Sequence, residues 1–173
     1  MTLMQVFGYK DQNVADHGSE IEVFDLYCGA GGFSAGARDA GCRVVFACDS
    51  SEEAIETHRR NHPQTNHWCT NLPRYDIPFP IDGRAFHVHG SPPCQQFSQM
   101  NQSGRSEAGI VGATEQLEWY IDTAISSGAT SWSMENVAQS CVLSVVKRKH
   151  LEHNRVFSYA VINFEKLGVP QSR

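Results

Sequence analysis

The chain has 173 residues, of which 40% are hydrophobic and 19% charged, and this balance excludes a disordered chain and suits one globular domain. Its net charge of −5 argues against a domain that grips nucleic acid over a whole face, so any such contact must be local or made by other parts. No apolar run approaches the roughly 20 residues of a transmembrane helix. The first residues lack the basic and apolar regions of a signal peptide.

In chain order, residues 1–20 are polar without a clear period and are predicted to be a loosely held, flexible leader. Short apolar runs then predict six strands, at residues 21–27, 43–49, 65–71, 84–90, 130–136 and 155–164. Helical patterns follow four of them, beginning after residue 28, at Ser50 or Ser51 as the N-cap, at 112 and at 140. The alternation predicts an α/β fold in residues 21–173, with a mostly parallel sheet and helices on both faces.

Ligands of such sheets bind outside the carboxyl ends of the strands, and three chemically suggestive stretches fall at that edge. The first is a glycine loop with Gly29, Gly31 and Gly32 between a strand and a helix. Its G-x-G-G spacing is not the dinucleotide fingerprint, and a plain structural turn is the alternative. Asp49 ends the next strand, where a carboxylate can accept hydrogen bonds from ribose hydroxyls.

The second stretch is "GSPPCQQFS" (90–98), in which two prolines stiffen the chain before Cys94. A lone cysteine is more often structural than catalytic, but a rigid loop at the ligand edge favours a nucleophile. The six cysteines form neither a C-x-x-C pair nor the framework of a small secreted domain. We therefore expect a reducing compartment in which most of the thiols are small buried hydrophobes.

The third stretch is "SMENV" (133–137), which places Glu135 at the end of a predicted strand. Burial raises a carboxyl pKa and favours a proton donor near neutral pH, whereas the alternative is an ordinary acid at a helix start. A cysteine and a protonatable carboxyl, without a nearby histidine base, indicate covalent addition to an electron-poor ring.

Two further patterns have plainer interpretations. The histidines at 58, 62 and 67 with Cys69 match no common zinc spacing, so no metal site is predicted. The "KRKH" stretch (147–150) is interpreted as a solvated helix end and not as a DNA-binding patch.

Four motifs, "FDLYCGAGGFS", "GSPPCQQFS", "MENV" and "GVPQSR", occur in the order and at the spacing of the cytosine-5 DNA methyltransferase family. The resemblance runs from Glu22 to Arg173. It implies a Rossmann-like methyltransferase fold, S-adenosyl-L-methionine as the methyl donor with S-adenosyl-L-homocysteine as product, no metal, and a flipped-out cytosine as acceptor.

The resemblance also implies roles for individual residues. Cys94 would attack carbon 6 of the ring, Glu135 would hold ring N3 and the exocyclic amine, and Arg173 matches the first arginine of the last motif. The cofactor would contact Tyr27, Gly29, Gly31, Gly32, Phe33, Asp49, Asn71, Leu72 and Pro93. The substrate would contact Gln95, Ser98 and Asn136. Asn71 and Asp49 depart from the family, which usually has an acidic residue and a glutamate there.

In the family the chain continues past "GVPQSR" into a seventh strand, a target-recognition region and a last helix. The seventh strand lies antiparallel between the fifth and sixth, so the sheet is expected to be incomplete, with the sixth strand unpartnered. DNA is the implied partner, together with a second chain if the missing region is supplied in trans. The alternatives are a non-catalytic cofactor-binding subunit and a tRNA methyltransferase. The expected location is intracellular, in the nucleus of a eukaryote or the cytoplasm or nucleoid of a bacterium or virus.

Overall fold

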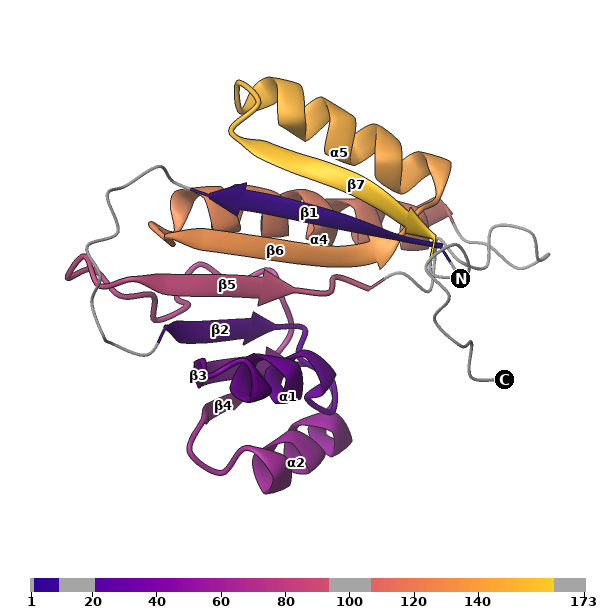
Figure 1. Ribbon diagram of the computed structural model, residues 1–173. Coiled ribbons are helices and arrows are strands. Elements are labelled where there is room, and N and C mark those ends of the chain that lie inside the picture. Colours follow the sequence, from indigo (N-terminus) through magenta and orange to yellow (C-terminus); the bar gives the residue numbers. More distant parts are fainter. Residues whose placement is uncertain (1, 10–20, 94–106, 164–173) are drawn as a thin grey trace.

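The computed structural model describes residues 2–9, 21–93 and 107–163, which form an α/β structure around one seven-stranded sheet (Figure 1). The strands are β1 (Thr2–Tyr9), β2 (Glu22–Leu26), β3 (Arg43–Asp49), β4 (Asn66–Cys69), β5 (Phe86–Gly90), β6 (Ser131–Val137) and β7 (Phe157–Asn163). The helices are α1 (Gly32–Asp39), α2 (Glu52–Asn61), α4 (Glu107–Ser126) and α5 (Ser140–Glu152). None of the helices described is long and apolar enough to cross a membrane.

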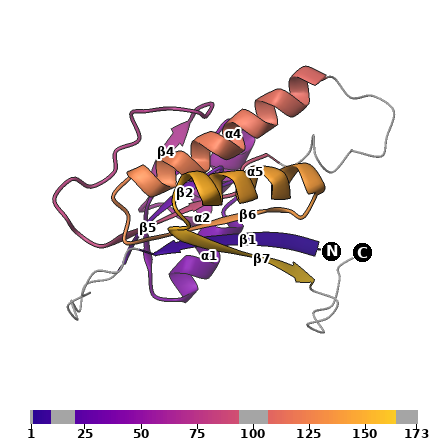
Figure 2. The ribbon, with the colours of Figure 1, turned by 90° about the horizontal axis from the view of Figure 1, so that it is seen from above.

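The strand order is β4-β3-β2-β5-β6-β1-β7, and the five strands from β4 to β6 run parallel. Helices α4 and α5 lie on one face of the sheet and α1 on the other (Figure 2). The six strands and four helices predicted from the sequence are all present, and the predicted parallel α/β arrangement is confirmed.

Local sequence accounts for these elements. All five residues of β2 are buried, as expected for a central strand covered on both faces. Helix α2 begins where Ser51 caps it, with the serine hydroxyl accepting a hydrogen bond from the Ala54 N–H at 3.2 Å. Glu52 and Glu53 lie in its first turn, where their negative charges interact favourably with the positive end of the helix dipole.

Strand β1 overturns two of the predictions. Residues 2–9 were expected to belong to a flexible leader, but they form a strand that pairs antiparallel with both β6 and β7. The sixth predicted strand, β7, was expected to lack its neighbour, and β1 lies beside it along its full length (Figure 1). The position between β6 and β7 is therefore filled by the amino-terminal strand.

The physical reason is the burial and the hydrogen bonding that this position offers. Met4 and Val6 are fully buried, so one side of β1 joins the core. Gly8 lies opposite Trp132, and a Cβ atom at Gly8 would lie 1.8 Å from the indole nitrogen, so only glycine fits beneath the ring. The strand also supplies partners to backbone groups of β6 and β7 that would otherwise be unpaired.

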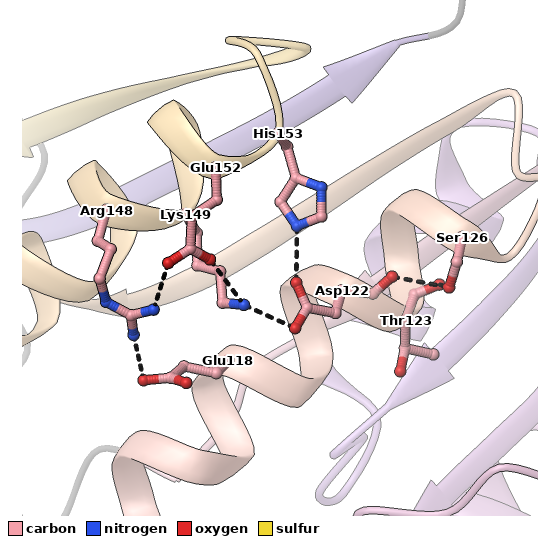
Figure 3. Close-up of polar contacts among 8 residues, drawn as sticks. All are labelled: Glu118, Asp122, Thr123, Ser126, Arg148, Lys149, Glu152 and His153. Atoms are coloured by element: carbon pink, nitrogen blue, oxygen red, sulfur yellow. Dashed lines mark hydrogen bonds and ion pairs between the residues drawn. The ribbon is translucent and has the colours of Figure 1, made fainter.

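A cluster of polar side chains joins α4 and α5 (Figure 3). Lys149 is only 8% exposed, and its ammonium group donates to Asp122 at 2.7 Å and pairs with Glu152 at 3.1 Å. Arg148 bonds Glu118 of α4 and Glu152 of its own helix. The interpretation of residues 147–150 as a solvated helix end is therefore wrong for Lys149, whose charge is used to hold two helices together.

Candidate active site

The candidate site lies at the carboxyl ends of β2 to β6, where the structure brings together four stretches that are far apart in the sequence. These are the turn after β2, Asp49 at the end of β3, the Ser91–Pro93 loop after β5 and Glu135 on β6. Cys94, Gln95, Ser98 and Arg173, four of the predicted site residues, lie outside the described residues.

The turn after β2 depends on residues with positive φ. Tyr27, Gly29 and Gly31 have φ values of 59°, 53° and 99°. At Gly31 an added Cβ atom would lie 3.0 Å from both His58 and His62, so glycine is required for space as well as conformation. At Gly29 an added Cβ atom would meet nothing within 4 Å, so this part of the turn faces open space.

Asp49 is fixed in orientation by backbone groups. Its Oδ2 accepts from the Gly29 N–H at 3.0 Å, and its Oδ1 accepts from the Ser51 N–H at 2.9 Å. The carboxylate therefore links the glycine turn to the start of α2. Each oxygen keeps a lone pair that can accept a further hydrogen bond.

A buried hydrogen-bonded line beneath the glycine turn was missed by the sequence analysis. The Ser34 hydroxyl donates to Asp25 Oδ2 at 2.6 Å, and it lies 3.0 Å from His58 Nε2. His58 Nδ1 in turn lies 2.8 Å from His67 Nε2. Burial raises the pKa of Asp25 to about 7, with Asp49 adding to the shift, and burial lowers the pKa of His58 to about 4.

This line tethers α1 and α2 under the turn, because Ser34 belongs to α1 and His58 to α2. No local signal marks these residues, since they lie 9 to 24 positions apart. Among the described residues, no group of three or more His, Cys, Asp or Glu side chains is arranged to hold a metal ion. Two members of the histidine pattern considered as a zinc spacing instead form hydrogen bonds here, His58 with Ser34 and His67 with His58.

The two aromatic residues of the predicted cofactor site have different surroundings. Tyr27 packs edge-on against Trp119 of α4 at 6.4 Å between ring centroids, and its buried hydroxyl has no hydrogen-bond partner within the part of the chain that the structure describes. Phe33 stacks on the imidazoles of His89 and His87, with centroid distances of 3.5 and 6.1 Å. Phe33 therefore covers polar groups on β5.

The other predicted cofactor residues lie in loops at the same edge. Asn71 is exposed and Leu72 is buried immediately after β4, while Pro93 is exposed after β5. Of the five cysteines that the structure describes, Cys28 and Cys48 are buried, Cys42 and Cys141 are partly exposed and Cys69 is exposed, so the expectation that most thiols are buried holds for only two of them.

The Ser91–Pro93 loop is fixed from both sides. Gly90 allows the ring of Tyr120 to pack against the backbone, because a Cβ atom there would lie 2.2 Å from that ring. Asn136 is buried, and its amide nitrogen donates to the Pro92 carbonyl at 3.0 Å. Asn136 therefore anchors the loop that leads to Cys94.

Glu135 is half-buried on β6 beside this loop. Burial raises the pKa of its carboxyl group, and a hydrogen bond from Ser91 opposes the shift. A carboxyl group with a raised pKa can hold a proton nearer to neutral pH and donate it to a ring nitrogen. This direction agrees with the role that the sequence analysis expected.

The geometry fits an adenosyl cofactor with a methionine part. The turn at Gly29 leaves open space against the backbone, the start of α1, which no side chain caps, suits a carboxylate, and Asp49 can accept from ribose hydroxyls. The orphaned Tyr27 hydroxyl provides one further polar group at the same turn.

The sheet order and this turn define a Rossmann-like methyltransferase fold. A solved structure with the same fold is a protein of an E. coli prophage described as a DNA modification methyltransferase, with a TM-score of 0.57 and 24% identity. The match covers 76% of this chain and 37% of that one.

The sequence comparison is more specific. The model of the family described as C-5 cytosine-specific DNA methylase matches residues 21–173, and the chain belongs to this family. Type II methyltransferase M.HindV of Haemophilus influenzae is 27% identical over 88% of this chain, and M.AgeI of Thalassovita gelatinovora is 34% identical over 51% of it. The chain spans 50% and 22% of the lengths of these two relatives.

Proposed function

We propose that the chain is the cofactor-binding and catalytic portion of a DNA cytosine-5 methyltransferase that uses S-adenosyl-L-methionine. The observation that carries this proposal is the meeting, at one edge of the sheet, of the glycine turn, Asp49, the loop leading to Cys94, and Glu135. Family membership supports it, as do relatives that are named type II methyltransferases.

Some of the site residues bind the cofactor, and others act on the target base. Asp49 and the glycine turn hold the adenosyl and methionine parts of the cofactor, which supplies an electrophilic methyl group when bound. Asn71 and Leu72 border the adenine after β4, and Tyr27 and Phe33 stiffen the walls around the turn. Pro93, which directly precedes the nucleophile in the sequence, contacts the cofactor.

The reaction proceeds on a cytosine extruded from the duplex. The Cys94 thiolate adds to carbon 6, while the Glu135 carboxyl group gives its proton to ring N3 and so accepts the charge that the addition creates. Carbon 5 then takes the methyl group. Water takes the proton from carbon 5, the C5–C6 double bond re-forms as the C6–S bond breaks, and N3 returns its proton to the Glu135 carboxylate, which leaves Cys94 free as a thiolate.

The remaining predicted residues contribute to the base side. Gln95 and Ser98 follow the nucleophile and contact the substrate strand, and Arg173 contributes a cation to the same pocket. Asn136 acts through the Pro92 carbonyl by fixing the direction of the loop. Target recognition is proposed to come from a part outside residues 1–173, either in the same polypeptide or in a second chain.

The test separates cofactor binding from covalent chemistry. We expect calorimetry to show binding of S-adenosyl-L-homocysteine, and DNA containing 5-fluorocytosine to form a covalent adduct in the presence of S-adenosyl-L-methionine. Cys94→Ser should abolish the adduct and keep cofactor binding. Cys42→Ser is the matched control, because Cys42 precedes β3 at the opposite edge of the sheet.

A cofactor complex without any adduct, with wild-type chain and DNA at high concentration, would indicate a non-catalytic binding subunit. An adduct that survives in Cys94→Ser would exclude this nucleophile.

A further inference from the structure

Hydrogen bonds run in a line between β5 and β6, from the amino-terminal ends of the strands to Ser91, whose side chain acts on the Glu135 carboxyl group. The members of this line, here called the β5–β6 polar chain, are Ser131, His87, Ser133, His89, Ser91 and Glu135. Ser131 Oγ lies 2.8 Å from His87 Nδ1, and His87 Nε2 lies 2.9 Å from Ser133 Oγ. Ser133 Oγ lies 2.8 Å from His89 Nδ1, and His89 Nε2 lies 3.2 Å from Ser91 Oγ. The Ser91 hydroxyl completes the line at the Glu135 carboxyl group.

The register of the two parallel strands produces this arrangement. His87 pairs with Ser131 and His89 pairs with Ser133, so alternate residues of both strands face the same side of the sheet. Ser91 and Glu135 continue the two rows by one more step past the last pair, Gly90 and Met134.

Most of the β5–β6 polar chain is shielded from water. His89 and Ser133 are 5% and 6% exposed, and the Phe33 ring of α1 covers both imidazoles. Burial lowers the pKa of His89 to about 3 and that of His87 to about 4, so both rings are neutral at working pH. A neutral imidazole has one donor and one acceptor nitrogen, and both nitrogens of each ring have partners here.

Among residues 2–9, 21–93 and 107–163, the elements packed on the β5–β6 polar chain bring the following groups near it. Asp25 of β2 is the register partner of His89, and its carboxyl group accepts from Ser34 of α1. On the opposite flank, β1 places the uncharged Gln5 beside Glu135. From α1, the residue over the imidazoles is Phe33.

The ionised form of Glu135 fixes the direction of every hydrogen bond. A carboxylate only accepts, so Ser91 donates to it and must accept from His89, which then carries its proton on Nε2. The bare Nδ1 of His89 accepts from Ser133. Ser91 and His89 therefore each donate one hydrogen bond and accept one.

The same logic continues to the end of the line. Ser133 accepts from His87, which also carries its proton on Nε2, and the bare Nδ1 of His87 accepts from Ser131. When Glu135 is protonated and donates to Ser91, each bond reverses, and both histidines carry the proton on Nδ1. The β5–β6 polar chain can form all of its hydrogen bonds in either direction. Conversion between the forms with ionised and protonated Glu135 moves one proton across each hydrogen bond.

The end remote from Glu135 reaches a hollow of about 410 Å³ on the α1 side of the sheet. Ser131 and His87 line it together with apolar residues that include Val23, Phe33 and Ala37. The hollow lies near the amino-terminal ends of the strands, away from the edge where the cytosine would bind.

We propose that the β5–β6 polar chain delivers a proton to Glu135 from this hollow, behind the carboxyl group, while the base covers its front. A proton enters at Ser131, one O–H or N–H bond forms and one breaks at each member, and a proton arrives at the Glu135 carboxylate. No oxidant, reductant or further reactant is needed. The proposal rests on the proposed function, in which Glu135 gives its proton to the ring.

The direct test is the tautomeric state of the two histidines, measured by two-bond ¹H–¹⁵N correlation on the cofactor-free chain. Both His87 and His89 should be Nε2–H at high pH and change to Nδ1–H together, at the midpoint at which Glu135 titrates. Ser133→Ala should uncouple His87 and leave His89 following Glu135. Ser91→Ala should uncouple both, and Ser144→Ala, an exposed serine of α5, should change neither.

The proposal would be overturned if His87 and His89 carried their protons on different ring nitrogens in the wild-type protein, or if their tautomers did not change as Glu135 titrates. This measurement needs no variant, cofactor or DNA. In the adduct assay, Ser133→Ala should slow the reaction on the order of 10- to 100-fold at unchanged DNA affinity. Ser133→Thr keeps the hydroxyl and should restore the rate. A rate of adduct formation that Ser133→Ala leaves unchanged would contradict proton delivery by the β5–β6 polar chain. A wild-type protein that forms no adduct but shows the expected tautomers would refute only the proposed function.

Discussion

Glycine at position 31 shows how a single backbone conformation supports the site. Its φ of 99° suits glycine, and its Cα lies against the two imidazoles of His58 and His62. The turn therefore packs on the same histidine that bonds Ser34. A change at one residue is expected to disturb the turn and the hydrogen-bonded line together.

We predict that Gly31→Ala lowers the free energy of unfolding by about 1–3 kcal/mol, because the left-handed conformation and the contact with His58 both become unfavourable. Urea denaturation measures this loss, and calorimetry should show weaker binding of S-adenosyl-L-homocysteine. The control is Gly36→Ala in α1, where an added Cβ atom meets nothing within 4 Å. This control should be neutral or stabilise the helix by about 0.5–1 kcal/mol, and equal losses in both variants would contradict the prediction.

At the scale of elements, β1 supports the whole β6–β7 half of the sheet. It pairs on one side with β6, which carries Glu135, and on the other with β7. Gln5 of β1 lies directly opposite Glu135. The amino-terminal strand thus helps to hold the strand on which the proposed acid stands.

We predict that Gly8→Ala displaces β1, because the new methyl group would overlap the indole of Trp132. A loss of about 1–3 kcal/mol in the free energy of unfolding is expected from such overpacking. Hydrogen exchange should accelerate in β7 and β6, with a change in tryptophan fluorescence.

The control for this change is Gly112→Ala in α4, where an added Cβ atom meets open space. Unchanged exchange in β7 after Gly8→Ala would show that β1 contributes little to the sheet.

At the scale of the whole molecule, buried titratable groups set the response to pH. Burial lowers the pKa of His58 and His87 to about 4 and that of His89 to about 3, so the unfolded chain binds protons below about pH 6.5 that the folded chain refuses. The free energy of unfolding that these histidines contribute is therefore lost as the pH falls from 6.5 towards 4. Asp25 has the opposite sign, because its pKa of about 7 lets the folded state keep a proton that the unfolded state releases above 3.8.

Three histidines outweigh one carboxyl group, so we predict that the free energy of unfolding rises with pH from about 4 to 6.5 and then levels off near 7. Each uncompensated proton contributes a slope of about 1.4 kcal/mol per pH unit. His58→Gln should reduce the slope between pH 4.5 and 6 by up to that amount, as measured by urea denaturation at several pH values. An identical slope in the variant would show that His58 is protonated in the folded state.

Sequence patterns predicted β2 to β7 because each run is short, apolar and bounded by turn residues. They failed for β1, whose apolar residues occur at odd and even positions alike and so give no clear period in the sequence. Its strand conformation is stabilised by partners more than 120 residues away, such as Trp132 opposite Gly8. The link from Ser34 to His58 was hidden for the same reason, since it joins two helices.

The sequence by itself determined the order and type of the elements from residue 21 onward, the Ser51 cap, the turn that needs glycine and the candidate acid at 135. These follow from local sterics, helix capping and periodic burial, which act over a few residues. Only the tertiary structure decided that β1 lies between β6 and β7, that His58 lies beneath the glycine turn and that two histidines line up behind Glu135. Strand pairing, desolvation and hydrogen bonding between distant residues set those features, and such contacts exist only once the chain has folded.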